Sequence, residues 1–150
     1  MNDVQRNLHL PRFLPYRLTK LSGVISRSLA GKYSALFDLT IHEWRIVAIL
    51  GSEPGLTARE IGPLASLDKV SISRAVEKLH KAGRLEKRTL KDDRRSAALY
   101  LTAKGKAVLA DITPLAQKYE DDLLAGFTPE EVEQLDHFLN RLDAAAEARK

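Results

Sequence analysis

Apolar residues recur every three or four positions in the first part of the chain. The stripe consists of Leu14, Leu18, Leu21, Ile25, Leu29, Tyr33 and Leu36. Because this spacing places side chains on one face of an α-helix, it predicts a long helix that begins after Pro11 or Pro15. Thr40 and Glu43 then have the spacing of a capping box, in which each residue satisfies a backbone N–H of the other. They predict a second helix that continues to Leu50.

Turn residues precede a short third helix. The segment 51–55 (GSEPG) has the composition of a turn. Thr57 and Glu60 repeat the capping-box spacing and mark where the third helix begins. Pro63 falls inside this helix, where it removes a backbone N–H that would normally donate to the carbonyl of Arg59. We therefore expect this helix to be short or distorted.

A fourth helix of two contrasting faces follows. Asp68 is a suitable N-cap, and Gly83 suits the left-handed position after the helix ends. The core face consists of Ile72, Val76 and Leu79. The opposite face is polar and largely basic, with Lys69, Ser73, Arg74, Glu77, Lys78 and Lys81. Short polar and basic groups on one helix face are suited to contact bases and phosphates.

Two segments after this helix have the pattern of β-strands. Residues 85–90 and 96–101 alternate in character and contain residues compatible with strands. The intervening segment 91–95 (KDDRR) carries too much charge to be buried, so it is expected to form the protruding tip of a hairpin. Arginines at such a tip can enter a narrow minor groove of DNA, where the potential is negative.

The last third of the chain predicts two more helices. Thr102 can cap a fifth helix that bends near Pro114 and ends at Gly126, and Thr128 can cap a sixth. Their apolar stripes are Val108, Ile112, Leu115, Tyr119, Leu123 and Phe127, then Val132, Leu135, Phe138, Leu139 and Leu142. The predicted fold is mainly α with a small β-hairpin wing. A winged helix-turn-helix region at 37–102 is combined with a helical dimerisation region at 1–36 and 103–150 in one structural domain.

Charge is concentrated in the winged part. Residues 57–102 contain 11 Lys/Arg and 6 Asp/Glu, whereas residues 1–56 contain 7 and 4, and residues 103–150 contain 6 and 10. The net charges are therefore +5, +3 and −4. A basic excess around the fourth helix and the hairpin favours a nucleic-acid partner. A solvated basic face without a partner is the alternative that charge alone leaves open.

Other features narrow the class of protein. The sequence has no cysteine, which excludes disulfides, thiolate metal sites and thiol nucleophiles. Its four histidines lack the close spacing of a helical metal site, and no catalytic or nucleotide-binding motif is evident, so we expect no metal, no cofactor and no enzymatic activity. No apolar run reaches the roughly 20 residues that span a bilayer, and the first residues do not resemble a signal peptide. We expect a cytoplasmic protein.

The sequence also resembles the multiple-antibiotic-resistance regulator (MarR) family of bacterial repressors over nearly its whole length. Residues 93–102 (DRRSAALYLT) are similar to the family's wing pattern of Asp, any residue, Arg, then Gly or Ser, ending in Leu-Thr. Supporting similarity lies in residues 39–45, 56–61 and 68–74, in the expected order. Pro63 departs from the family, which usually has a helix-forming residue at that position.

The resemblance implies a transcription regulator, most simply a repressor, that binds a palindromic DNA operator as a homodimer. The first, fifth and sixth helices would form the dimer, and a lipophilic or phenolic ligand would release the DNA. Asp68 would pair with Arg95, and Asp68 and Asp93 would both stabilise the wing. A role as a helix cap would explain the presence of Asp68 equally well. The expected DNA contacts are Lys69, Ser71, Ser73, Arg74, Lys78, Lys91, Arg94 and Arg95. The residues to inspect for ligand binding are Arg17, His42, Trp44 and Arg45.

Two other functions remain open at this point. A winged helix can bind another protein instead of DNA, since a fold does not dictate a function. A nonspecific DNA-binding protein is the nearer alternative. A closed monomeric bundle likewise competes with the homodimer. The basic recognition face with small polar residues favours DNA over a protein partner.

Overall fold

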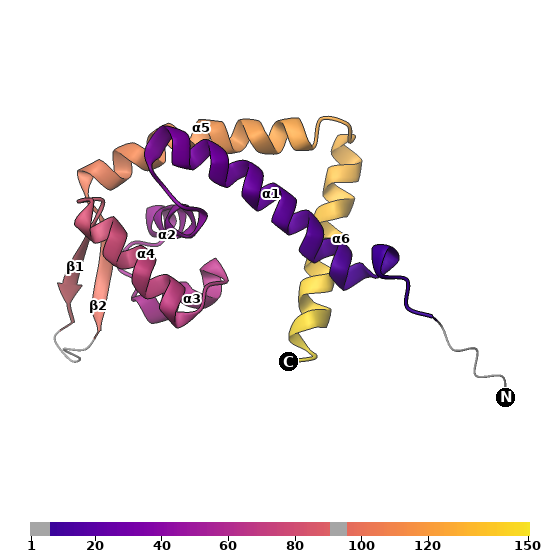
Figure 1. Cartoon of the computed structure of the whole chain (residues 1–150), viewed down its shortest axis with the longest axis horizontal. Helices are drawn as coiled ribbons and strands as arrows, with labels where there is room; N and C mark the ends of the chain where they lie inside the picture. Colours follow the sequence, from indigo (N-terminus) through magenta and orange to yellow (C-terminus); the bar gives the residue numbers. More distant parts are fainter. Residues whose placement is uncertain (1–6, 91–95) are drawn as a thin grey trace. The chain divides into compact units, whose positions relative to one another are not determined.

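The computed structural model describes residues 7–90 and 96–150 of the chain. In chain order, the elements of these residues are η1 (Leu10–Arg12), α1 (Leu14–Phe37), α2 (Ile41–Ser52), α3 (Ala58–Ala65), α4 (Lys69–Lys81), β1 (Leu85–Thr89), β2 (Ala97–Leu101), α5 (Ala103–Leu123) and α6 (Pro129–Glu147). Figure 1 shows the helices in this order, with the two strands as one hairpin. The predicted fold class, mainly α with a small β-hairpin, is confirmed.

The helix boundaries follow from the local sequence. Pro15 lies in the first turn of α1, where its missing N–H costs nothing. The helix ends at Asp38, whose left-handed backbone (φ 51°) turns the chain away. In α3, Thr57 and Glu60 form both halves of the expected capping box. This helix contains Pro63 and is only 8 residues long, which agrees with the short helix expected from the proline. It is followed by Ser66, whose backbone has a left-handed conformation (φ 54°).

Glu43 does not complete the capping box predicted for α2. The Thr40 Oγ1 atom accepts a hydrogen bond from the Glu43 backbone N–H at 3.2 Å, so the cap itself is present. The Glu43 carboxylate, however, is buried and lies 3.5 Å from the Nζ atom of Lys78 on α4. Its attraction to a cation on another helix replaces the predicted return to the Thr40 backbone.

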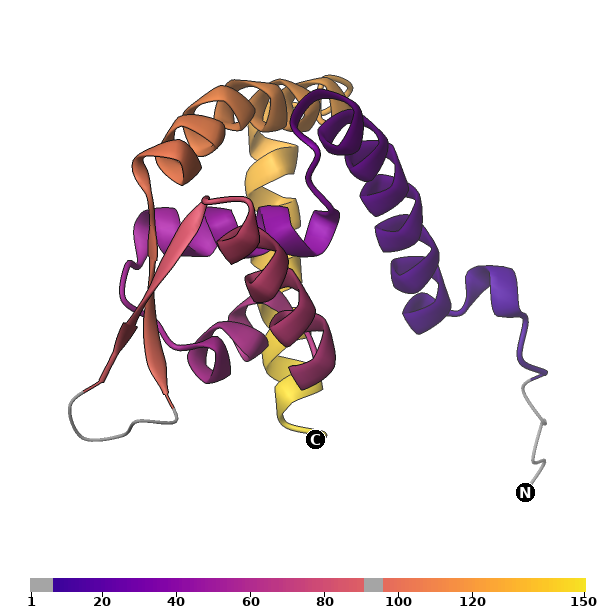
Figure 2. The same ribbon diagram turned by 60° about the vertical axis from the view of Figure 1, so that its left-hand side comes forward.

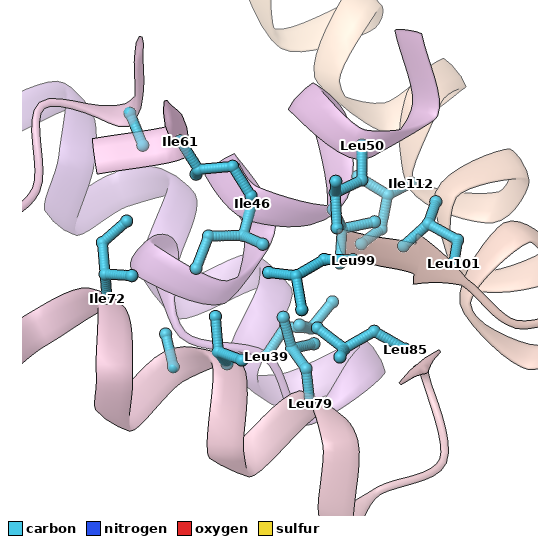
Figure 3. Close-up of a cluster of buried hydrophobic side chains, with 14 of the residues drawn as sticks. Leu39, Ile46, Leu50, Ile61, Ile72, Leu79, Leu85, Leu99, Leu101 and Ile112 are labelled. Carbon is cyan, nitrogen blue, oxygen red and sulfur yellow. The ribbon is translucent and has the colours of Figure 1, made fainter. Parts of the chain in front are cut away.

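The core of the winged region is a single cluster of aliphatic side chains. Figure 3 shows residues from α2, α3, α4, both strands and the middle of α5 directed toward one another. Those it labels are Leu39, Ile46, Leu50, Ile61, Ile72, Leu79, Leu85, Leu99, Leu101 and Ile112. Burial of these side chains is the main force that holds α4 and the hairpin in place, since each contributes about 1.5–3 kcal/mol.

The hairpin pairs β1 with β2 in antiparallel register, from Leu85 opposite Leu101 to Thr89 opposite Ala97. Its two strands run side by side and extend away from the end of α4 (Figure 2). The other edge of β2 also pairs, because the Gly55 N–H donates to the Leu99 carbonyl and the Leu99 N–H donates to the Leu56 carbonyl, each at 2.9 Å. This pairing ties the loop before α3 to the hairpin.

The chain packs as two compact units, with the division between Ile112 and Thr113, inside α5. The fifth helix ends at Leu123, three residues before the predicted end at Gly126, and Phe127 lies in the following turn. In the second unit, Thr128 and Glu131 form the predicted capping box of α6, with Pro129 in its first turn. No helix in the two described ranges is both long and apolar enough to cross a membrane.

Candidate nucleic-acid interface

The fourth helix separates its residues sharply into a buried and an exposed face. Ile72, Ala75, Val76 and Leu79 are all at most 6 % exposed. Their spacing of three and four residues makes one stripe against the core, as the sequence predicted for three of them. The remaining side chains of α4 therefore cannot turn inward, and its polar face is held outward in a fixed orientation.

Asp68 fixes the beginning of α4. Its Oδ1 atom accepts a hydrogen bond from the Ser71 N–H at 2.8 Å, and its Oδ2 atom accepts one from the Ser71 hydroxyl at 2.9 Å. The bond from the Ser71 backbone is the main reason why the pKa of Asp68 lies below its ordinary value. Asp68 is thus a helix cap in the described structure, and Ser71, a predicted DNA contact, directs its hydroxyl hydrogen to this carboxylate.

The exposed face of α4 carries the other predicted contacts. Lys69, Ser73 and Arg74 are all exposed to solvent. Lys78 is also largely exposed, but it supplies the positive charge 3.5 Å from the buried Glu43 carboxylate. Three of the four residues therefore present donors to solvent from one helix, whereas Lys78 already has a contact inside the protein.

Ion pairs attach the hairpin to α4 and order its exposed surface. The Nζ atom of Lys87 on β1 lies 3.4 Å from the Oε2 atom of Glu77 on α4. On the same strand, the Arg88 guanidinium lies 4.0 Å from the centre of the Tyr100 ring and 2.7 Å from the Glu86 carboxylate. The pKa of Arg88 is raised, mainly by the hydrogen bond to Glu86. Sequence reasoning missed these pairs, although three consecutive charged residues, Glu86, Lys87 and Arg88, within a predicted strand were a usable signal.

Lys91, Asp93, Arg94 and Arg95 lie outside the described residues. Their predicted contacts with DNA, and the pairing of Asp68 with Arg95, thus stay predictions. The last described pair of the hairpin is Thr89 with Ala97.

Arg84 makes further contacts that the sequence did not reveal. Its Nη2 atom donates to the Phe37 carbonyl at 2.6 Å, and its Nη1 atom donates to the Asp38 carbonyl at 3.3 Å. These carbonyls belong to the C-terminal end of α1, where backbone acceptors lack helical partners. Arg84 itself begins the hairpin after α4, so it connects α1 directly to the base of the hairpin.

A separate hollow lies between α1, α2 and α3. It has a volume of about 480 Å³ and is lined by Ser22, Trp44, Arg45, Ala48, Ile49, Leu64, Ala65 and Ser66. The structure thus brings two of the predicted ligand residues, Trp44 and Arg45, to one cavity. Arg17 is exposed on α1 and His42 is half-buried on α2, and neither lines this hollow.

Trp44 and Arg45, which line this hollow, are both positioned by contacts with other residues. The Trp44 ring lies 5.2 Å from the ring of the buried Tyr33, measured between centroids. Arg45 donates from Nη1 to the Ala65 carbonyl at 3.3 Å. Burial also raises the pKa of Tyr33 and leaves its hydroxyl without a hydrogen-bond partner.

In the described part of the chain, no three His, Asp or Glu side chains are grouped closely enough to hold a metal ion.

Comparison with known proteins identifies this arrangement. The model of the MarR family matches residues 37–96. The HTH-type transcriptional regulator BilQ of Clostridium symbiosum is 33% identical over 102 residues, which cover 68% of this chain and 71% of BilQ. The homoprotocatechuate degradative operon repressor of Escherichia coli is 25% identical over 113 residues, 75% of this chain and 76% of the repressor.

A solved structure agrees over nearly the whole chain. The MarR/EmrR family transcriptional regulator from Acinetobacter sp. ADP1 superposes with a TM-score of 0.86 at 26% identity, covering 94% of this chain and 99% of that one. The relatives are transcription regulators, and the helix with an outward basic face suits that role. The chain belongs to the MarR family and is a DNA-binding transcription regulator with a winged helix-turn-helix.

Proposed function

We propose that the protein is a repressor that binds a palindromic operator as a homodimer and leaves it when a small lipophilic or phenolic ligand binds. The observation that carries this proposal is the outward face of α4, on which Lys69, Ser73 and Arg74 are exposed while the opposite face is buried. A helix of this width fits the major groove of B-DNA, and its rigid attachment to the core lets side chains reach defined base edges.

Each side chain has a distinct task in this proposal. Arg74 can donate two parallel hydrogen bonds to a guanine, and the Ser73 hydroxyl can contact a neighbouring base or phosphate. Lys69, in the first turn of α4, would bind a phosphate. At the hairpin, Lys91, Arg94 and Arg95 would contact the backbone and the adjacent minor groove.

The homodimer rests on the apolar side chains that the terminal helices expose. Every residue of α6 is described and none is buried. Its exposed apolar residues are Leu135, Phe138, Leu139 and Leu142, and α1 exposes Leu14, Leu18, Leu21 and Val24. An amphipathic helix with its apolar face in water is unstable and prone to associate. A second copy of the chain would cover these faces around a twofold axis and present two α4 helices to one palindrome.

The proposed ligand site is the hollow beside Trp44 and Arg45. An aromatic wall and a guanidinium suit a small aromatic acid, because the ring can stack and the carboxylate can form paired hydrogen bonds. The relationship to the E. coli repressor of an operon for homoprotocatechuate degradation supports both the repressor role and a phenolic ligand. The ligand would act by binding more tightly to a form in which the two α4 helices no longer match the operator spacing.

Selection of bound sites from random double-stranded DNA tests the DNA-binding part of the proposal. Wild-type protein should enrich an inverted repeat with half-sites about one helical turn apart. Arg74→Ala should bind the selected duplex more than tenfold more weakly. Enrichment of no sequence despite tight binding would indicate a nonspecific DNA-binding protein. Absence of DNA binding would instead favour a winged helix that binds a protein partner.

Sedimentation of a charged variant tests the homodimer. Leu139→Glu places a carboxylate on the apolar face of α6 and should give a monomer that has lost affinity for the palindrome. Ala144→Glu is the matched control, because it adds the same charge about 140° further around the helix. The proposal of a homodimer fails if wild type sediments as a monomer, or if both variants behave like wild type.

Calorimetric titration tests the ligand site, with homoprotocatechuate as the probe. Binding to wild type, a loss of affinity in Arg45→Ala, and release of the selected duplex by the same compound are the expected results. Arg17→Ala and His42→Ala are the comparison variants, because Arg17 and His42 are predicted ligand residues that do not line the hollow. Binding that is equally strong in Arg45→Ala would place the ligand elsewhere.

A further inference from the structure

One apolar residue of α4 lies outside its buried stripe. Val70 is 60% exposed, whereas Ile72, Ala75, Val76 and Leu79 are at most 6% exposed. It is the second residue of the helix, directly after Lys69. Valine has a weaker helix propensity than Lys, Arg, Glu or Gln, so neither the core nor the helix itself accounts for its presence at an exposed position.

Helical geometry places Val70 at the centre of the outward face. A helix turns about 100° per residue, so Val70 lies about 180° around the axis from Leu79, which is fully buried. The residues three and four positions later, Ser73 and Arg74, flank it on the same face. Whatever surface Ser73 and Arg74 contact, Val70 therefore contacts as well.

The chemistry of a valine limits what it can recognise in the major groove. Its isopropyl group neither donates nor accepts a hydrogen bond, so it would leave a donor or acceptor of a base unpaired. The C5-methyl group of thymine is the apolar group that the major groove exposes. Valine is also branched at Cβ and nearly fixed at χ1 in a helix, so it loses little side-chain entropy when it packs against such a group.

We propose that Val70 contacts a thymine methyl group in each half-site and so specifies a T·A pair beside the bases that Ser73 and Arg74 contact. The inference rests on the proposed function, because it requires that α4 enters the major groove at a defined sequence. It adds an apolar specificity residue to a set of contacts that is otherwise polar and basic. The rigid N-cap at Asp68, two residues earlier, holds Val70 in place for this role.

Replacement of thymine by uracil removes only the methyl group and tests the inference directly. The probe is the duplex that wild-type protein selects from random DNA, with uracil introduced at one thymine position at a time in both half-sites. For wild type, uracil at one position should weaken binding about fourfold for each methyl group removed. For Val70→Ala the same substitution should have almost no effect, because the side chain no longer reaches the methyl group.

Ser73→Ala is the matched control on the same face, and it should keep the wild-type sensitivity to uracil. Val70→Ala should unfold at the wild-type temperature, since Val70 is exposed and alanine favours helix. The inference is overturned if wild type tolerates uracil at every thymine, or if Val70→Ala keeps the same sensitivity. A wild-type protein that selects no sequence would overturn the proposed function together with this inference, whereas the first two outcomes leave the proposed function intact.

Discussion

The Nζ atom of Lys78 lies 3.5 Å from the Oε1 atom of Glu43, and this pair joins α4 to α2. The two partners differ in environment: the Glu43 side chain is 4% exposed and that of Lys78 is 61% exposed. The Oε1 atom of Glu43 has no hydrogen bond to another group. A buried carboxylate in this position depends on Lys78 for compensation of its charge.

Removal of Lys78 should therefore destabilise the protein through Glu43. We expect Lys78→Met to lower the free energy of unfolding by about 1–2 kcal/mol, less than for a fully buried pair because water reaches Lys78. In the double variant with Glu43→Gln, the two effects should fail to add by about 1 kcal/mol. Urea denaturation of the four proteins measures this coupling, and strict additivity would show that the pair does not stabilise the fold.

The same pair shows where sequence reasoning reaches its limit. Thr40 with Glu43 and Thr57 with Glu60 have identical spacing, and both predicted a capping box. Only the second forms one, because α4 brings Lys78 beside Glu43, and that approach depends on tertiary packing between residues 35 positions apart. A local pattern predicts which hydrogen bonds are possible, whereas a distant charge decides which of them forms.

Arg84 should stabilise the junction between α1 and the hairpin. Arg84→Met removes the donors to the Phe37 and Asp38 carbonyls, so we expect the free energy of unfolding to fall by about 2 kcal/mol. Arg88→Met serves as the control, since it removes an arginine from the exposed side of the adjacent strand, and its effect should be clearly smaller. Equal effects of the two substitutions in thermal denaturation would contradict the role of Arg84.

Gly105 should tolerate no side chain. It is buried in the first turn of α5, and a Cβ atom there would collide with the carbonyl oxygen of Arg84. We expect Gly105→Ala to cost about 2–3 kcal/mol. Gly31→Ala in α1 is the opposite case, because no atom beyond its chain neighbours and the backbone of its own helix lies within 4 Å of the added methyl group, and it should stabilise the helix by about 0.5–1 kcal/mol. Chemical denaturation of both variants measures the contrast, and a destabilised Gly31→Ala or a neutral Gly105→Ala would disagree with the structure.

Asp68 should make stability depend on pH in the acid range. Its pKa is lowered from 3.8, so its charge stabilises the folded state above that value and this contribution disappears as the pH falls through the lower folded pKa. Asp68→Asn keeps a good N-cap without the charge. The difference in Tm between wild type and this variant should be constant between about pH 5 and pH 7 and vanish well below about pH 3.8. A difference that grows on acidification would have the wrong sign.

The elements themselves were largely predictable, and the connections between them were not. Helix starts at Thr57, Asp68 and Thr128 follow from capping residues that act within one turn, so the sequence contains their cause. The pairing of Gly55 and Leu56 with the free edge of β2 joins segments more than 40 residues apart. No periodicity indicates such a pairing.

The candidate site follows the same division. Lys69, Ser73 and Arg74 were placed on the outward face by the 3.6-residue period alone, and the structure exposes all three. The exposure of Val70 does not follow from the sequence, because a valine two residues before Ile72 is compatible with a core position until the burial of each side chain is known. The contact of Lys78 with Glu43 was equally invisible, since Glu43 lies on another helix.

The affinity of the protein for its selected duplex, measured against salt, tests most directly whether the outward face of α4 binds DNA. Wild-type affinity should fall at least a hundredfold between about 50 and 200 mM salt, because contacts with phosphates release counterions. Arg74→Ala should bind at least about tenfold more weakly, whereas Lys118→Ala, which removes a cation paired with Asp122 on α5, should bind like wild type. Wild-type affinity that is indifferent to salt, together with an unchanged Arg74→Ala, would contradict the account.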